Sequence, residues 1–146
     1  MSLREKIAQE LVRIFKEIED PRVVLVTREP YEADKLAITQ FPAMLVQIAK
    51  EDRETITMGA PAVGRRMGTI TVNLRCHVRG VELDRKRNDL IEGIEEQIEK
   101  DRYLNLKSSG VLDTQVTYIE VIERLAPLAE ILIELQIRYN YLRGTT

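Results

Sequence analysis

His77 is the single histidine of this 146-residue chain, and it directly follows the single cysteine, Cys76. A nucleophilic or metal site would need such groups on one face, within hydrogen-bond or ligand distance. The alternating pattern of residues 69–78 predicts a strand, in which neighbouring side chains point to opposite faces. We therefore expect Cys76 to be a small core residue and His77 to be solvated or at an interface. We expect no catalytic residue and no metal ligand.

Residues 59–66 (Gly-Ala-Pro-Ala-Val-Gly-Arg-Arg) have the glycine spacing of a phosphate-binding loop. Arginine, however, stands where that loop has its lysine and its Ser or Thr. Such a loop also opens a helix, whose first amides point at the anion, whereas a strand pattern follows here. The sequence therefore predicts neither nucleotide binding nor any other cofactor.

Composition restricts the function classes further. The chain has 22 basic and 24 acidic residues, a net charge of -2, so no general basic field attracts nucleic acid. One cysteine forms no intrachain disulfide, which favours a reducing compartment. No stretch of about 18 apolar residues could span a membrane, and the N-terminus lacks a signal core. We expect one domain, residues 1–146, made in the cytoplasm without a membrane partner.

The elements that would position these residues follow from periodicity. In the central strand, residues 69–78, apolar side chains alternate with a polar face that carries Arg75, His77 and Arg79. Ser2 and Glu5 indicate a capping box for a helix that ends near residues 20–21, and Asp84 would cap a second helix ending near Asp101. The remaining expectations are strands at 23–27, 41–48, 114–123 and 129–142, and a protruding flexible loop at 51–66.

The resulting order is helix, three strands, helix, two strands. The simplest arrangement for it is an α+β fold of two layers. We expect a mainly antiparallel five-stranded sheet with both helices packed on one face.

With the elements in this order, the chain resembles the phage tail terminator family, the tail-completion or lambda-type minor tail proteins. The likeness covers most of the chain from Phe41 onward. It is carried by Phe41-Pro42-Ala43 at the start of a strand, a central strand closing in Val78-Arg79-Gly80, a helix leading into Asp101-Arg102-Tyr103-Leu104, and Val111-Leu112-Asp113-Thr114 before two long strands.

The resemblance implies a structural virion protein without enzymatic activity. Members of that family form a ring, typically of six copies, on the last layer of the tail tube. The ring stops tube growth and joins the tail to the connector or neck protein of the head, and DNA passes transiently through its lumen. The resemblance thus places the protein at the head-proximal end of the tail, after assembly in the host cytoplasm.

The second predicted helix has an unusual charge order. Its basic start and acidic end oppose the helix dipole. One interpretation is a solvated face that tolerates these charges. The other is a subunit interface, in which the basic start of one copy meets the acidic end of the next and the ring closes. The residues concerned are Arg85, Lys86, Arg87, Glu95, Glu96 and Glu99.

Four arginines, Arg65, Arg66, Arg75 and Arg79, are candidates for the tube-facing or lumen-facing surface. The alternative interpretation is that these arginines are ordinary solvated surface residues. In a ring they would make weak, salt-sensitive contacts with passing DNA, and the loop at 51–66 would order on docking. The alternative function is a small nucleic-acid-binding module that uses these arginines on an open sheet face. The absence of interleaved aromatic residues weakens that alternative.

Overall fold

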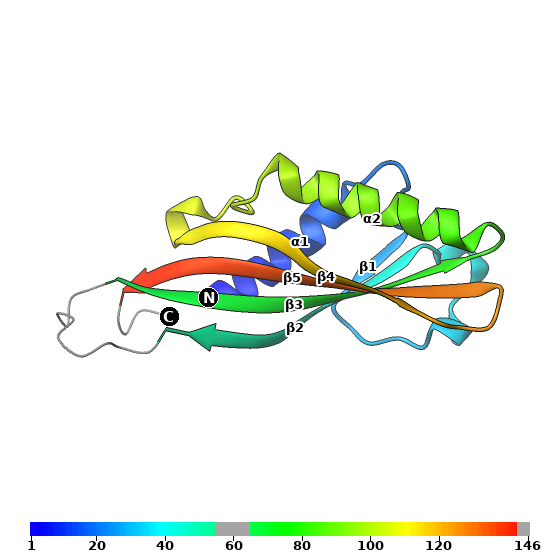
Figure 1. Ribbon diagram of the computed structural model, residues 1–146, viewed down its shortest axis with the longest axis horizontal. Helices are drawn as coiled ribbons and strands as arrows, with labels where there is room; N and C mark the ends of the chain where they lie inside the picture. Colours follow the sequence, from blue (N-terminus) through cyan, green and yellow to red (C-terminus); the bar gives the residue numbers. More distant parts are fainter. Residues whose placement is uncertain (55–64, 143–146) are drawn as a thin grey trace.

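Strand β3 (Arg65–Arg79) is the centre of the sheet, between β2 (Ala43–Arg53) and β5 (Leu128–Leu142), as its long alternating pattern predicts. The structure, a computed structural model, describes residues 1–54 and 65–142, without the side chains of Arg65 and Leu142. Helices α1 (Leu3–Lys16) and α2 (Leu83–Lys100) pack on one face of the sheet (Figure 1). The predicted α+β fold of two layers is confirmed.

The sheet has the order β1-β2-β3-β5-β4, with β1 (Leu25–Thr27) at one edge and β4 (Val111–Ile122) at the other. Every pairing is antiparallel except that of β1, which runs parallel to β2. The predicted mainly antiparallel five-stranded sheet is confirmed, and the parallel β1 is its one exception among the described strands. Parallel neighbours need a crossover, and residues 28–42 supply one that contains the two short 3₁₀ turns Ala33–Lys35 and Ile38–Gln40.

The core lies between the sheet and the helices. Leu11 and Phe15 of α1 and Leu90 and Ile94 of α2 are fully buried against the apolar face of β3 and β5. Burying one such side chain contributes about 1.5–3 kcal/mol, so this single layer of contacts dominates the stability. Cys76 belongs to this core, as the sequence predicts.

Both helices differ from the prediction at their ends. Helix α1 stops at Lys16, and residues 17–22 turn across α2, where Gly93 leaves room for Ile18 and Pro21. Ser2 caps α1 as predicted, but the Glu5 carboxylate pairs with Arg28 instead of closing the capping box. Asp84 was also predicted wrongly as a cap, because α2 starts at Leu83, and its N-cap residue Glu82 accepts no capping hydrogen bond through its side chain.

Strands β2 to β5 are longer than the sequence indicates, whereas β1, predicted at 23–27, is shorter. Strand β2 continues to Arg53 and β3 starts at Arg65, so both flanks of the predicted loop at 51–66 are strand. The rest of the predicted flexible loop, residues 55–64, lies outside the described residues. Strands β4 and β5 occupy the two C-terminal segments predicted as strands, β4 starting three residues earlier and β5 one.

In the part of the chain that the structure describes, one end of the sheet is covered on the face opposite the helices. Residues 28–42 cross it there, on the side opposite α2 (Figure 1). Under this segment lie His77 and Glu130, both buried. The sequence predicted an open polar face, and the tertiary structure closes part of it.

Candidate assembly surfaces

Strand β4 is an edge strand with an apolar surface. Tyr118, Ile119 and Val121 are 49%, 41% and 52% exposed, and Leu112 and Leu125 are exposed at the two ends of the same segment. β4 pairs with β5 on one side, so its other edge presents backbone N–H and C=O groups without a strand partner. An edge strand with exposed apolar residues is a template for pairing with another chain.

Sequence reasoning treated this segment as an ordinary strand. A signal was available, because apolar residues occur at consecutive positions 118–119 and 121–122, where a half-buried strand alternates. A strand with apolar side chains on both faces is either buried on both faces or leaves some of those side chains exposed. Only the sheet order decides between them, by placing β4 at an edge.

The predicted basic start of α2 is largely engaged within the chain. The Lys86 ammonium donates to the backbone oxygen of Arg79 at 3.1 Å, and Arg87 pairs with Asp84 at 3.1 Å. Arg85 extends into solvent, with Glu82 at 3.9 Å. The role of these three residues in an interface stays a prediction, and Arg85 is the residue best placed to fulfil it.

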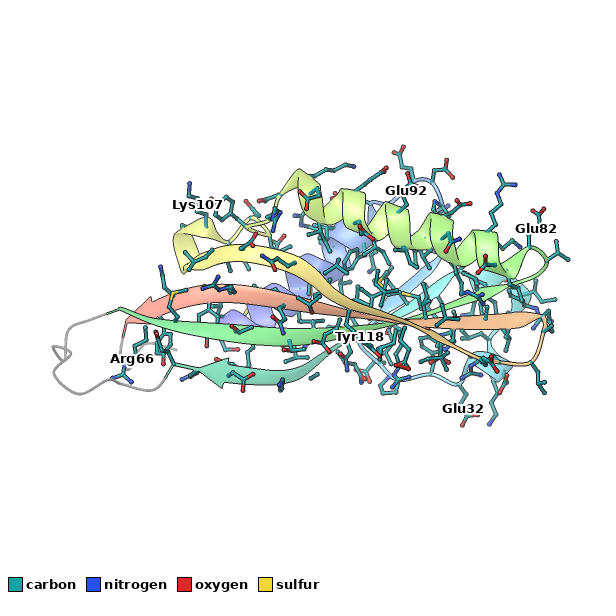
Figure 2. All side chains as sticks on the ribbon, viewed as in Figure 1. Glu32, Arg66, Glu82, Glu92, Lys107 and Tyr118 are labelled. Atoms are coloured by element: carbon teal, nitrogen blue, oxygen red, sulfur yellow. The ribbon has the colours of Figure 1, made fainter. Side chains whose placement is uncertain are left out.

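The acidic part of α2 lines a shallow open hollow of about 670 Å³. Ile91 is the apolar residue in this hollow, and Glu92 points away from the sheet (Figure 2). Glu99 also pairs with Arg102 at 3.3 Å. Glu95, Glu96 and Glu99, the three predicted interface acids, are therefore together on one exposed surface, at the opposite end of α2 from Arg85.

The four candidate lumen-facing arginines do not form one patch. Alternation along β3 puts Arg66 on the face of the sheet that carries the helices, whereas Arg75 and Arg79 are on the other face. Arg66 lies at the far end of the sheet from the start of α2 (Figure 2). The side chain of Arg65 is outside the described residues. Arg66 is thus separated from Arg75 and Arg79, which share one face, and the nucleic-acid-binding alternative stays a prediction.

A buried polar cluster holds the crossing segment on the sheet. Nδ1 of His77 lies 2.7 Å from the Tyr31 hydroxyl, and its Nε2 lies 3.0 Å from the Glu130 carboxylate. Because an ionised carboxylate only accepts, Nε2–H donates to Glu130, and neutral Nδ1 accepts from Tyr31. Arg124 donates to Glu130 at 2.6 Å and pairs with Asp34 of the crossing segment at 3.5 Å.

The electrostatics of this cluster favour a structural role. Burial lowers the pKa of His77, against the opposing effect of Glu130, so the imidazole is neutral at pH 7. Burial also raises the pKa of Tyr31, which keeps its hydroxyl protonated. The pKa of Glu130 is lowered overall, because the hydrogen bond from Arg124 and the neighbouring charges outweigh burial. The cluster thus contains one ionised acid, held by arginines, and no activated nucleophile.

His77 is therefore placed differently from the prediction. The sequence predicted a solvated or interface residue, but the side chain is 7% exposed. The reason is the crossover before β2, which brings Tyr31 over the polar face of β3. Arg75, on the same face, stays exposed and donates to Glu130 at 3.0 Å.

Among residues 1–54 and 65–142, no group of three His, Cys, Asp or Glu side chains is arranged to hold a metal ion. Within the same ranges, neither helix has the length and hydropathy needed to cross a membrane. The sequence matches no protein-family model and no curated protein.

Proposed function

We propose that this protein is a phage tail terminator, a structural subunit that assembles with copies of itself into a ring on the end of the tail tube. The observation that carries the self-assembly is the apolar edge strand β4, whose Tyr118, Ile119 and Val121 are exposed outside the buried core. Exposed apolar side chains along one open edge are an interaction surface. The resemblance of the sequence from Phe41 onward to tail terminators supports the tail as the place of assembly.

In this role the ring would stop tube polymerisation and present its other rim to the connector or neck protein. Its partners would be further copies of itself, the tail tube protein and the head, with DNA passing through the lumen. Its place would be the head-proximal end of the virion tail. Such a ring acts by shape and repetition and needs no reactive group.

Native mass measurement over a series of protein concentrations, combined with electron microscopy, tests the assembly. We expect a closed ring with one defined number of copies, six on the resemblance. A monomer at every concentration, or open filaments without a closed species, would contradict ring formation.

The placement on tails needs a separate experiment. Tail tubes polymerised with the protein should stop at a defined length and carry a ring at one end. Tails assembled without it should grow beyond normal length and fail to accept heads. Normal, head-competent tails in its absence would exclude the terminator role, whatever the protein's oligomeric state.

A further inference from the structure

We infer that neighbouring copies join by pairing β4 of one copy with the uncovered part of β2 of the next, so that Glu120 lies opposite Lys50. This inference rests on the proposed ring and specifies its joint. The second copy is the partner because the same chain carries two complementary open edges. Among the described residues, β1 pairs with β2 only at residues 43–45, and no other described strand pairs with that edge at residues 48–53, which form the second open edge.

The strand directions suit this joint. β2 and β5 both run antiparallel to β3, and β4 runs antiparallel to β5, so β4 and β2 have opposite directions. Rotation about a ring axis that lies roughly along the strands preserves these directions in every copy. β4 of one copy therefore meets β2 of the next as an antiparallel pair, which is the more stable ladder.

The charges select a register. Lys50 of β2 pairs with Thr71 of β3. Glu120 of β4 pairs with Leu132 of β5, which in turn pairs with Arg75 of β3. Thr71 and Arg75 point to one face of β3, so Lys50 and Glu120 also share the helix-free face. Both side chains are exposed. An opposite-charge pair directly across two strands stabilises the pairing, whereas like charges oppose it.

The same register has a reasonable ring geometry. The positions on β3 to which Lys50 and Glu120 correspond, Thr71 and Arg75, are four residues apart, or about 13 Å along the strand direction. Four strand spacings, about 19 Å, separate equivalent strands of successive copies. A shift of 13 Å over 19 Å corresponds to a strand tilt of about 35°, within the range that closed sheets adopt.

A pair of two β4 edges is the competing arrangement, and it is less favourable. The charged residues of β4 are Asp113 and Glu120, both acidic. Pairing β4 with itself would bring acids together without a basic residue opposite. It would also close as a dimer and leave the edge of β2 unused.

Disulfide trapping tests the joint directly. Cys76 is fully buried and does not interfere. Lys50→Cys and Glu120→Cys are made as separate variants and mixed under mild oxidation. We expect a covalent dimer in the mixture and monomer in each variant alone. A covalent dimer of Glu120→Cys by itself would show the β4–β4 pair and overturn the inference.

Charge reversal provides a second readout. Glu120→Lys and Lys50→Glu should each raise the concentration needed for half-assembly by about tenfold, and the double reversal should restore it. Lys35→Glu, an exposed charge change on the crossing segment, is the matched control and should leave assembly unchanged.

The two proposals fail in different ways. Rings that form but are indifferent to both reversals and give no mixed disulfide would refute the edge pairing and leave the ring intact. A protein that stays monomeric, alone and on tail tubes, would refute the ring and the joint together.

Discussion

Glu130 connects distant parts of the chain through one carboxylate. It accepts from His77 and Arg75 of β3 and from Arg124 of the β4–β5 connection, and Arg124 also reaches Asp34. These bonds replace the water that a buried carboxylate loses. Burial raises the pKa of Glu130, but the interactions with Arg124 and His77 outweigh it and lower the pKa overall. The cluster fixes the crossing segment over the sheet, so its protonation state is linked to stability.

Stability should therefore depend on pH through His77. Its pKa is lowered from the ordinary 6.5, so the unfolded chain takes up a proton first as the pH falls. The free energy of unfolding is highest above the ordinary value and should decrease from about pH 7 to pH 5.5, by at most about 1.4 kcal/mol per pH unit for one proton. Denaturant unfolding across that range measures this slope.

His77→Gln is the control, because it keeps a polar side chain that does not titrate. It should flatten the dependence between pH 7 and 5.5. The contribution of Glu130 is separate, since its lowered pKa gives stability that is lost only as the pH falls below its ordinary value of 4.5. An equal slope in the wild type and in His77→Gln would contradict the assignment.

Among the elements, the two helices are connected by a specific polar contact. The buried Gln97 amide of α2 donates to the backbone oxygen of Ile14, at the C-terminal end of α1, at 2.7 Å. The same oxygen also accepts the Glu17 N–H at 3.1 Å, so the Gln97 amide is a second donor that supports the end of α1. It also sets how the helices lie on the sheet.

Gln97→Leu should lower the free energy of unfolding by about 0.5–1.5 kcal/mol, because the variant removes one of the two hydrogen bonds to the Ile14 carbonyl. The measurement is denaturant unfolding at pH 7. Gln9→Leu, at an exposed position of α1, is the matched control and should change the stability by less than about 0.5 kcal/mol. Equal effects of the two substitutions would show that the Gln97 bond does not contribute.

At the level of the whole molecule, the sheet has a stable interior and two unequal edges. The β1 edge is short and is joined to the crossing segment, whereas the β4 edge is long and apolar. Native sheets usually protect such edges with charges or bulges, and β4 has bulges near Asp113 and Tyr118. The stretch between Tyr118 and Ile122 still pairs regularly, and it is the part that we assign to assembly.

Val121→Lys should shift the protein toward monomer and leave its folding stability within about 0.5 kcal/mol, because the side chain is already exposed. Sedimentation and thermal unfolding measure the two effects. Val81→Lys provides the comparison, since Val81 is 76% exposed but lies in the turn between β3 and α2, away from both edges of the sheet. If both substitutions weaken assembly equally, general surface charge and not the β4 edge is responsible.

The sequence alone was sufficient for the α+β class, the central strand, the burial of Cys76 and the apolar faces of the two helices. Each of these depends on a short-range period of two or 3.6 residues, which is visible locally. The tertiary structure alone decided the parallel β1, the burial of His77, the division of the arginines between two faces and the open edge of β4. These features depend on which distant segments become neighbours, as with His77 and Glu130, 53 positions apart. No local pattern contains that information, because strand order is determined by the packing of the whole chain.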